Sequence, residues 1–355
     1  MTKDQSPIIL AFSGGLDTSF CVPWLKETYG RDVVTATIDT GGIDADAAIA
    51  LEERALALGA IEHILIDCKH DFFETVIRHL IAGNVLRGHA YPLCVGAERG
   101  LQAAQLARLA AERGATTVAH GCTAAGNDQV RFEVALRTLN PGLEILAPVR
   151  DNSWVRDEQL NYLEQHDLPL PAQGSAYSIN RGLWGITIGG QETLGSENTI
   201  PEDAWVLSAD AFNTPQADSK HTIEFVVGVP TALDGELLTP VALIEKLEAL
   251  AGSYGIGRGI HLGDTVLGTK GRVAFEAPAA IALITTHREL EKLVLSAQQI
   301  RVKDSVASIY GDLVHEGKQL DLVCNDIEAF FHQPNNASRA QSSSHSNQAT
   351  SLLKA

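Results

Sequence analysis

The sequence predicts an α/β protein in which a parallel sheet covered by helices on both faces is followed by a smaller α+β domain. Short apolar runs alternate with helical periods through the first half, which is typical of repeated β-α-β units. A glycine turn follows the first apolar run, and the pattern changes beyond about Asp151. With 355 residues, the chain is long enough for two domains.

Each apolar run of the first half has the length and composition of a buried strand. The predicted strands are Ile8–Phe12, Val33–Ile38, Ile61–Cys68, Thr116–Ala119 and Leu143–Val149. The helices predicted between them are Thr18–Tyr29, Ala45–Leu58 and Arg99–Arg113. Pro23 lies inside the first of these helices and predicts a kink or a tight first turn there.

The second half begins after a helix predicted at Trp154–His166 and a proline-rich linker, Leu168–Pro171. We therefore expect a nucleotide-binding domain at residues 1–168 and a substrate domain at residues 169–332. The elements predicted in the second domain are strands at Thr222–Val229 and Thr265–Leu267 and helices at Pro240–Ala251 and Thr286–Val314. Residues 333–355 are rich in Asn, Ser and Gln, and we expect a disordered polar tail.

The glycine turn reads Ala-Phe-Ser-Gly-Gly-Leu-Asp-Thr-Ser from Ala11 to Ser19. It directs backbone N–H groups, three hydroxyls and the start of a helix at one point, as pyrophosphate binding requires. The common phosphate loop needs a lysine, and none stands between Ser13 and Lys26, so the turn suits pyrophosphate as a leaving group. The signature resembles that of the ATP pyrophosphatase families, which split ATP into AMP and pyrophosphate. The structural alternative is a Gly-Gly turn followed by a helix cap.

Two other predicted strands end in polar segments, Asp39–Gly42 and His120–Thr123. Because the carboxyl ends of parallel strands share one edge of a sheet, these segments are expected beside the glycine turn. The second segment continues to Arg131, whose guanidinium can bind a carboxylate, and includes Asp128, which can hold an ammonium group. This pattern indicates amino-acid binding; the alternative is a Gly-Asn-Asp turn that caps a helix.

Composition narrows the class of partner. The net charge of −17 comes from 27 basic and 44 acidic residues, which weighs against nucleic acid and anionic membranes and favours small substrates. The five cysteines are widely spaced and include no Cys-x-x-Cys pair, so neither a disulfide framework nor a zinc site is expected. The sequence shows no signal peptide and no apolar run of about 18 residues, so we expect a cytoplasmic protein.

The two motifs together resemble the argininosuccinate synthase family, ligases that join citrulline to aspartate using ATP. Further matching segments are Ala176–Asn180, Leu183–Gly185, Glu202–Trp205, Tyr254–Gly259 and Gly268–Arg272. The resemblance implies an ATP pyrophosphatase domain, like that of the adenine nucleotide α-hydrolases, with ATP and Mg²⁺ as cofactors. It also implies a citrullyl-AMP intermediate from which the amino group of aspartate displaces AMP, a step of arginine biosynthesis.

Carried over position by position, the resemblance assigns three sets of binding residues. The implied ATP contacts are Ala11, Phe12, Ser13, Gly14, Gly15, Leu16, Asp17, Thr18, Ser19 and Gly121. The implied aspartate contacts are Thr123, Asn127 and Asp128, and the implied citrulline contacts are Tyr91, Asn127, Arg131, Ser178 and Thr187. We expect catalytic roles for Asp17, Asp128 and Arg131, and no metal ligands from the protein.

Three positions depart from the family pattern. Gly96, Gly263 and Phe275 stand where serine, glutamate and tyrosine are expected. Loss of three polar contacts weakens citrulline binding by several powers of ten unless other groups compensate, and Asp264 is expected to supply the missing carboxylate.

Two alternatives remain open: a weak or silent paralogue that binds nucleotide, and a ligase for another ureido or amide compound. Family members usually continue beyond the region that matches Glu316–Phe331, so we expect a possible homo-oligomer with tetramer formation in doubt. Two other classes of ATP pyrophosphatase fit the sequence less well. Glutamine-dependent members need a glutaminase cysteine near the first residue, and none stands there. RNA-thiolating members bind an anionic substrate and use paired cysteines, whereas this chain has a net charge of −17 and no Cys-x-x-Cys pair.

Overall fold

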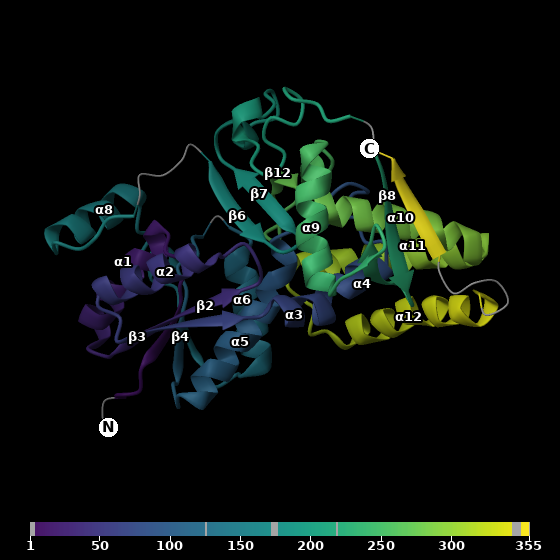
Figure 1. The fold of residues 1–355 in the computed structure, drawn as a ribbon. Helices are drawn as coiled ribbons and strands as arrows, with labels where there is room; N and C mark the ends of the chain where they lie inside the picture. Colours follow the sequence, from purple (N-terminus) through teal and green to yellow (C-terminus); the bar gives the residue numbers. More distant parts are fainter. Residues whose placement is uncertain (1–3, 125, 172–176, 218, 343–348, 355) are drawn as a thin grey trace. The chain divides into compact units, whose positions relative to one another are not determined.

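A computed structural model describes residues 4–124, 126–171, 177–217, 219–342 and 349–354 (Figure 1). The chain divides into two compact units, and each is described by itself. Unit 1 consists of Met1–Cys68 and Arg99–Gly174, and unit 2 of Lys69–Glu98 and Ser175–Ala355. The segment Lys69–Glu98 thus groups with the second half of the chain, although it lies within the first domain expected from the sequence.

Unit 1 contains the predicted parallel sheet, with strand order β3-β2-β1-β4-β5. The strands are β1 (Ile8–Ala11), β2 (Val33–Asp39), β3 (Glu62–Asp67), β4 (Thr117–Ala119) and β5 (Glu144–Leu146). The fifth strand is shorter than predicted because Pro148, which cannot donate to a sheet, begins a short helix.

Helices cover both faces of this sheet, as predicted. They are α1 (Leu16–Tyr29), α2 (Ala45–Ala57), α5 (Arg99–Glu112), α6 (Asp128–Leu139), α7 (Pro148–Asp151) and α8 (Arg156–Gln165). Side chains alternate along β1, so Ile8 and Leu10 pack in one core with Phe20 of α1. Ile9 packs on the other face with Leu106 of α5.

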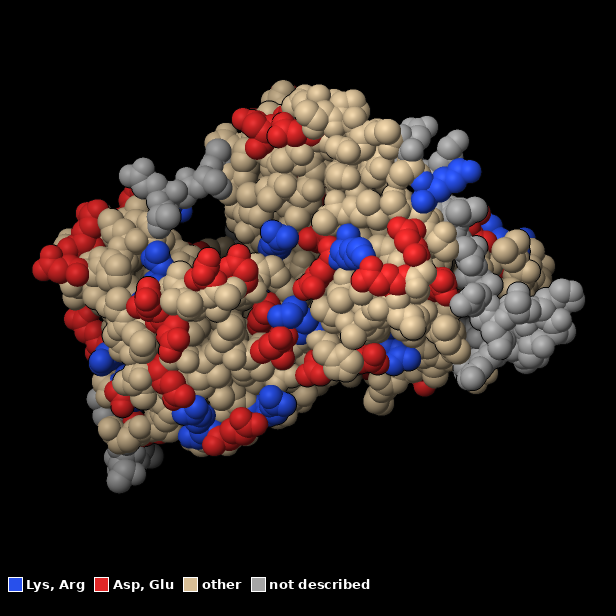
Figure 2. All heavy atoms as spheres, viewed as in Figure 1, with Lys and Arg blue, Asp and Glu red and all other residues tan. Residues whose placement is uncertain are grey.

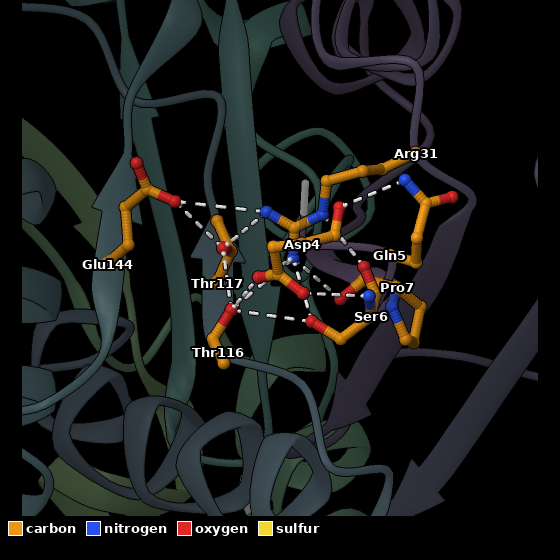
Figure 3. A network of polar contacts seen from close by, with 8 residues as sticks. All are labelled: Asp4, Gln5, Ser6, Pro7, Arg31, Thr116, Thr117 and Glu144. Carbon is orange, nitrogen blue, oxygen red and sulfur yellow. Dashed lines mark hydrogen bonds and ion pairs between the residues drawn. The ribbon is translucent and has the colours of Figure 1, made fainter. Parts of the chain in front are cut away.

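Arg31 closes the amino ends of the strands in unit 1 (Figure 3). Its guanidinium donates to the Ser6 carbonyl at 2.7 Å and to the Thr117 hydroxyl at 2.8 Å, and pairs with Asp4 at 3.3 Å. The hydroxyl of Thr116 donates to the Asp4 carboxylate and is the main cause that lowers the pKa of Asp4 to about 2. These groups lie at the amino end of the sheet, opposite the carboxyl end that the glycine turn follows.

Unit 2 is built on two antiparallel sheets with strand orders β11-β12-β7-β6 and β10-β9-β8-β13. The strands are β6 (Ser178–Gly182), β7 (Gly185–Gly189), β8 (Lys220–Val226), β9 (Val229–Leu233), β10 (Glu236–Leu237), β11 (Arg258–Asp264), β12 (Lys270–Glu276) and β13 (Ala349–Lys354). The helices with α-helical geometry are α3 (Lys69–Phe72), α4 (Arg78–Ala82), α9 (Pro240–Ser253), α10 (Pro278–Val294), α11 (Ala297–His315) and α12 (Leu322–Ser342). Four short helices of other geometry carry the label η. The π-helix is η1 (Phe73–Ile77), and the 3₁₀-helices are η2 (Gly96–Glu98), η3 (Gln191–Leu194) and η4 (Glu202–Ala204).

Two elements predicted for the second domain are wrong. The strand expected at Thr265–Leu267 is the turn between β11 and β12, where the Thr265 N–H donates to the Thr269 carbonyl at 2.7 Å. The helix expected at Thr286–Val314 is broken into α10 and α11. A capping box at Ser296 and Gln299 starts the second helix.

The polar segment from Gln333, expected to be a disordered tail, is partly ordered as far as the structure describes it. The helix α12 continues to Ser342, and β13 pairs antiparallel with β8; residues 343–348 and 355 lie outside the described part. Cys324, Ile327 and Phe331 are buried at helical spacing, so their packing holds the start of α12 and the helix extends from there. Among the described residues, no helix is both long and apolar enough to span a membrane.

Two buried histidines make stability depend on pH. Burial lowers the pKa of His120 to about 4 and that of His287 to about 3, from 6.5 in the unfolded chain. The unfolded chain therefore binds more protons below pH 6.5, so stability is lost as the pH falls toward the folded values. We expect His120 alone to lower the free energy of unfolding by about 2 kcal/mol between pH 6.5 and 5.

Urea denaturation across this pH range tests the expectation. The His120→Asn variant should show a flatter dependence of unfolding free energy on pH than the wild type. Parallel curves for the two proteins would contradict it.

Candidate nucleotide and amino-acid site

The turn after β1 is fixed to the neighbouring strand. The Phe12 N–H donates to the Ala36 carbonyl at 2.9 Å, and the Thr37 hydroxyl donates to the Phe12 carbonyl at 2.6 Å. Gly14 has a φ of 72°, and a Cβ there would lie 2.6 Å from a methyl group of Leu51. The turn therefore requires glycine at this position.

The first turn of α1 begins without a side-chain cap. Gly15 is the N-cap residue, and it has no side chain that could accept a hydrogen bond from the first amides. The Thr18 hydroxyl lies 3.3 Å from both the Ser13 N–H and the Ser13 hydroxyl, and Ser19 Oγ lies 3.4 Å from the Gly14 carbonyl. Uncapped amides and hydroxyls at the start of a 14-residue helix have the chemistry of an anion site.

Gly121 joins the second polar segment to this turn. A Cβ on Gly121 would lie 2.9 Å from Thr18 Cγ2, 3.1 Å from the Thr18 nitrogen and 3.2 Å from the Asp17 carbonyl carbon. The backbone after β4 thus touches the first turn of α1. Unit 1 therefore brings together the two segments predicted to converge at the carboxyl edge of the sheet.

Asp128, the first residue of α6, lies between two guanidinium groups. Arg99 Nε donates to one carboxylate oxygen at 2.9 Å, and Arg131 Nη1 donates to the other at 2.7 Å. Burial opposes ionisation of this carboxyl, but the two guanidinium groups outweigh it and hold the pKa of Asp128 below its usual range. Asp128 is therefore an ionised acceptor that orients both arginines.

The third predicted segment, after β2, connects to the same cluster. Gln102 accepts a hydrogen bond from Arg99 at 2.8 Å and donates to the Thr40 hydroxyl at 3.2 Å. Asp39 accepts from the Gly41 N–H at 2.8 Å and shapes the glycine turn there. Side chains that follow β2 and β4 are thus linked in one network through α5.

Sequence patterns did not indicate three polar residues of unit 1 that hold site residues. Arg99 and Gln102 lie on α5, and Gln159 on α8 donates to the Asp17 carboxylate at 3.0 Å. These helices carry no motif of their own. The available signal was an arginine and a glutamine three residues apart at the start of α5.

Unit 2 holds the other predicted citrulline residues on one face of the β11-β12-β7-β6 sheet. Thr187 is paired with Asn180 on β6 and with Phe275 on β12. Ser178 lies two residues before Asn180 on β6, so its side chain is on the same face. The ring of Tyr91 lies 5.2 Å from that of Phe275. The opposite face carries Ile186, Ile188 and Ala274 in a buried core.

The proposed compensation by Asp264 is wrong. Gly263 lies on the same sheet face as His261, and a Cβ there would lie 2.9 Å from Arg87 Nη1. Asp264 is the next residue of β11, so its side chain points to the opposite face, where it pairs with Lys270. Alternation along the strand keeps this carboxylate away from the face that carries Thr187.

Gly96 is the first residue of the short helix η2. The residues before it are strained: Leu93 has a φ of 64° and Val95 a φ of 65°. Left-handed backbone at such residues costs about 1–3 kcal/mol each and is typical of binding sites. The surrounding structure therefore maintains a strained backbone between Tyr91 and Glu98.

A Ser-His-Asp chain of hydrogen bonds in unit 2 has the connectivity of a hydrolase triad, but its role is structural. It consists of Ser219, His221 and Asp234. His221 lies between the Ser219 hydroxyl and the Asp234 carboxylate, 2.8 Å from the latter. Asp234 also accepts from the Thr222 N–H at 2.8 Å, and Ser219 contacts the Tyr254 hydroxyl at 2.8 Å. These bonds fasten β8 to the Asp-Gly turn after β9 and to the end of α9.

Comparison with known proteins covers both units. Residues 7–169 match the family model of the arginosuccinate synthase N-terminal HUP domain, and residues 177–341 match that of the arginosuccinate synthase C-terminal domain. These matches agree with the predicted ATP pyrophosphatase fold, followed by a domain with antiparallel sheets.

Curated relatives match along most of their length. The argininosuccinate synthase of Methanocaldococcus jannaschii is 38% identical over 323 residues, 91% of this chain and 81% of the relative. That of Dehalococcoides mccartyi is 40% identical over 91% of this chain and 80% of its own, and that of Lactiplantibacillus plantarum 40% over 94% and 80%. A solved structure, a predicted subunit of tRNA methyltransferase from M. jannaschii, gives a TM-score of only 0.32 at 18% identity, over 45% of this chain and 74% of that one. The chain belongs to the argininosuccinate synthase family.

Proposed function

We propose that the chain catalyses the ATP-dependent condensation of L-citrulline with L-aspartate, which forms argininosuccinate and releases AMP and pyrophosphate in arginine biosynthesis. The observation that carries this proposal is the contact of Gly121 with the first turn of α1. This contact supports the proposal, because the turn proposed to bind phosphate and the segment with Asp128 and Arg131 then lie side by side inside unit 1. A triphosphate and an amino acid are then held next to each other.

The β1–α1 turn and Gly121 are proposed to bind ATP through the residues assigned from the sequence, Ala11–Ser19. Lys26, the nearest following lysine, donates to the Gly59 carbonyl at 3.3 Å and is engaged away from the turn. A turn of amides and hydroxyls without a lysine supports release of pyrophosphate rather than transfer of the terminal phosphoryl group.

The reaction follows from the chemistry of the ureido group, whose carbon is a poor electrophile. We propose that the ureido oxygen attacks the α-phosphorus and pyrophosphate leaves, and that the amino group of aspartate then displaces AMP. No protein nucleophile is needed, and positioning of the reactants contributes about 7–11 kcal/mol. Asp17, Asp128 and Arg131 are the residues proposed for catalytic roles.

Thr123, Asn127 and Asp128 are proposed to bind aspartate, and Tyr91, Asn127, Arg131, Ser178 and Thr187 to bind citrulline. Several of these groups already have partners within their own units. The Tyr91 hydroxyl donates to the Cys94 carbonyl at 2.6 Å, and Arg131 donates to Asp128. Substrate binding therefore exchanges or shares existing hydrogen bonds.

Mg²⁺ is proposed to arrive with the nucleotide. Within the part of the chain that the structure describes, no group of three or more His, Cys, Asp or Glu side chains is arranged to hold a metal ion. Mg²⁺ commonly binds through substrate phosphates and water with few protein ligands. We therefore propose that the phosphates of ATP and water supply most of the ligands of the ion.

We propose that the chain acts on small molecules and is located in the cytoplasm, and the surface charge and the cysteines support these proposals. On the face shown in Figure 2, Lys and Arg side chains are scattered among Asp and Glu rather than gathered in one basic area. All five cysteines are free, which suits a reducing compartment. Assembly into a homo-oligomer stays a prediction for light scattering to test.

Product analysis tests the proposed function. The purified chain with MgATP should form AMP and pyrophosphate in equal amounts only when citrulline and aspartate are both present. Release that is unchanged without citrulline would contradict the substrate, and nucleotide binding without turnover would instead favour the silent-paralogue alternative.

Replacing Gly121 by alanine is expected to lower kcat/KM for ATP by about 10- to 100-fold, because the added methyl group displaces the first turn of α1 from the phosphates. The control is Gly195→Ala, where a Cβ meets nothing within 4 Å. Steady-state kinetics of both variants measure the effect. Equal kinetics for the two would show that the Gly121 contact does not matter.

A further inference from the structure

His261 on β11 lies on the same sheet face of unit 2 as the proposed citrulline residue Thr187. Phe275 of β12 is paired with Thr187 on one side and with Gly259 on the other, and paired residues share a face. His261 is two residues beyond Gly259 on β11, so its side chain is also on this face. Ile188 and the rest of the buried core lie on the opposite face. The face with His261 is therefore the one that a ligand of this sheet can use.

The imidazole ring of His261 belongs to a row of aromatic side chains. It stacks on the ring of Tyr91, with the centroids 5.3 Å apart and an interplanar angle of 18°, and Tyr91 is in turn next to Phe275. Gly263 makes room for the imidazole, since a Cβ there would lie 2.5 Å from His261 Nε2. The ring thus lies beside Tyr91, which is also a proposed citrulline residue.

Arg87 determines which nitrogen of His261 carries the proton. Its Nη1 lies 3.1 Å from His261 Nε2. The other nitrogens hold the guanidinium in place, because Nε pairs with Asp312 at 3.3 Å and Nη2 donates to the Asp264 carbonyl at 3.1 Å. A guanidinium group can only donate, so Nε2 accepts and the neutral ring carries its proton on Nδ1. Burial and the charge of Arg87 lower the pKa of His261, which keeps the ring neutral at pH 7.

The Nδ1–H group is a donor that faces no acceptor among the residues that the structure describes. The ring is half-buried, and its neighbour at Nδ1 is Gly88, which has no side chain to cover this atom. A neutral N–H group binds a carboxylate or carbonyl oxygen and cannot bind an ammonium group. Citrulline has such oxygens in its α-carboxylate and its ureido group. Since the ureido oxygen forms the bond to phosphorus in the proposed reaction, the α-carboxylate is the acceptor that fits His261.

We propose that His261 Nδ1–H donates a hydrogen bond to the α-carboxylate of the ureido substrate, an assignment that rests on the proposed function. Arg87 is the positioning residue that fixes this donor. The carboxylate does not react, so the bond is made equally in the bound substrate and in the transition state, and its loss raises KM rather than lowering kcat.

The test compares His261→Phe, which keeps a ring beside Tyr91 but lacks the donor, with His261→Asn, whose amide N–H can replace Nδ1–H. His261→Phe should raise the KM for citrulline about 10- to 100-fold, as expected for a bond to a charged acceptor. Its kcat and its KM for ATP should stay within twofold of the wild type, and His261→Asn should recover part of the loss. The control is His70→Phe, which replaces an exposed histidine of α3 and should keep wild-type kinetics.

Citrullinamide, in which the α-carboxylate is a neutral amide, identifies the group that His261 binds. The ratio of kcat/KM for citrulline to that for citrullinamide should fall at least about fivefold in His261→Phe, because a bond to a charged acceptor is about twice as strong as one to a neutral acceptor. An unchanged ratio, or a KM for citrulline within twofold of the wild type, overturns the assignment alone.

Two further outcomes are distinct from these. Equal losses toward citrulline and ATP with a lowered unfolding midpoint show a structural role for His261 and also overturn the assignment. A wild-type chain without citrulline-dependent turnover overturns the proposed function and this assignment with it.

Discussion

Asp128→Asn is expected to lower kcat/KM for aspartate at least about 100-fold. The carboxylate makes charge-assisted bonds, each about 1.5–3 kcal/mol, and it orients two guanidinium groups as well as the proposed substrate ammonium. An asparagine keeps the shape but turns an N–H group toward one arginine. One of Arg99 and Arg131 then loses its acceptor, both lose the negative charge beside them, and the amino acid loses its counter-charge.

The matched control is Glu62→Gln, since the Glu62 carboxylate binds Arg113 at 2.6 and 2.7 Å on the exposed side of unit 1. Surface pairs of this kind contribute little to stability, so the control should keep wild-type kinetics. Steady-state assays with aspartate varied measure both variants. A loss below about fivefold for Asp128→Asn, which is under 1 kcal/mol, would exclude its role.

Glu291→Leu is expected to lower the free energy of unfolding of unit 2 by about 3–5 kcal/mol. Lys303 pairs with Glu291, and these residues are 1% and 5% exposed. Asn84 donates to the other Glu291 oxygen at 2.5 Å and accepts from His287 at 2.7 Å. Removal of the carboxylate leaves a buried ammonium group without its counter-charge.

The double variant Glu291→Leu/Lys303→Met should recover most of this loss, because the unpaired charge is gone and the volume is kept. On the surface of α10, Glu289→Leu breaks an exposed pair with Lys292 and should change stability by less than about 1 kcal/mol. Urea denaturation compares the four proteins. A double variant as unstable as Glu291→Leu would show that packing, not charge, holds this cluster.

Short runs of mainly apolar and β-branched residues predicted the sheet of unit 1. The same signals were weaker in unit 2. A helical period spans Ser296 without interruption, so only the capping pair with Gln299 marks the break between α10 and α11. The hairpin of β11 and β12 carries polar and glycine positions, which hide its strands from a hydrophobicity pattern.

The glycine turn and the segment from Gly121 to Arg131 could be predicted because their polar residues lie within a few positions of one another in the sequence. Arg99 and Gln159 reach site residues from separate helices, and no local pattern reports such contacts. The face on which Asp264 lies follows from strand register, which was not available before the hairpin was known. The grouping of Lys69–Glu98 with unit 2 is likewise a tertiary property.

The central claim is that this chain holds ATP so that the ureido oxygen of citrulline attacks its innermost phosphorus. Turnover of citrulline labelled with ¹⁸O at the ureido oxygen, with aspartate and MgATP, tests this directly by mass spectrometry of the products. The account predicts that the label appears in AMP, one atom for each argininosuccinate formed. Label found in pyrophosphate or inorganic phosphate, or unlabelled AMP formed alongside argininosuccinate, would contradict it.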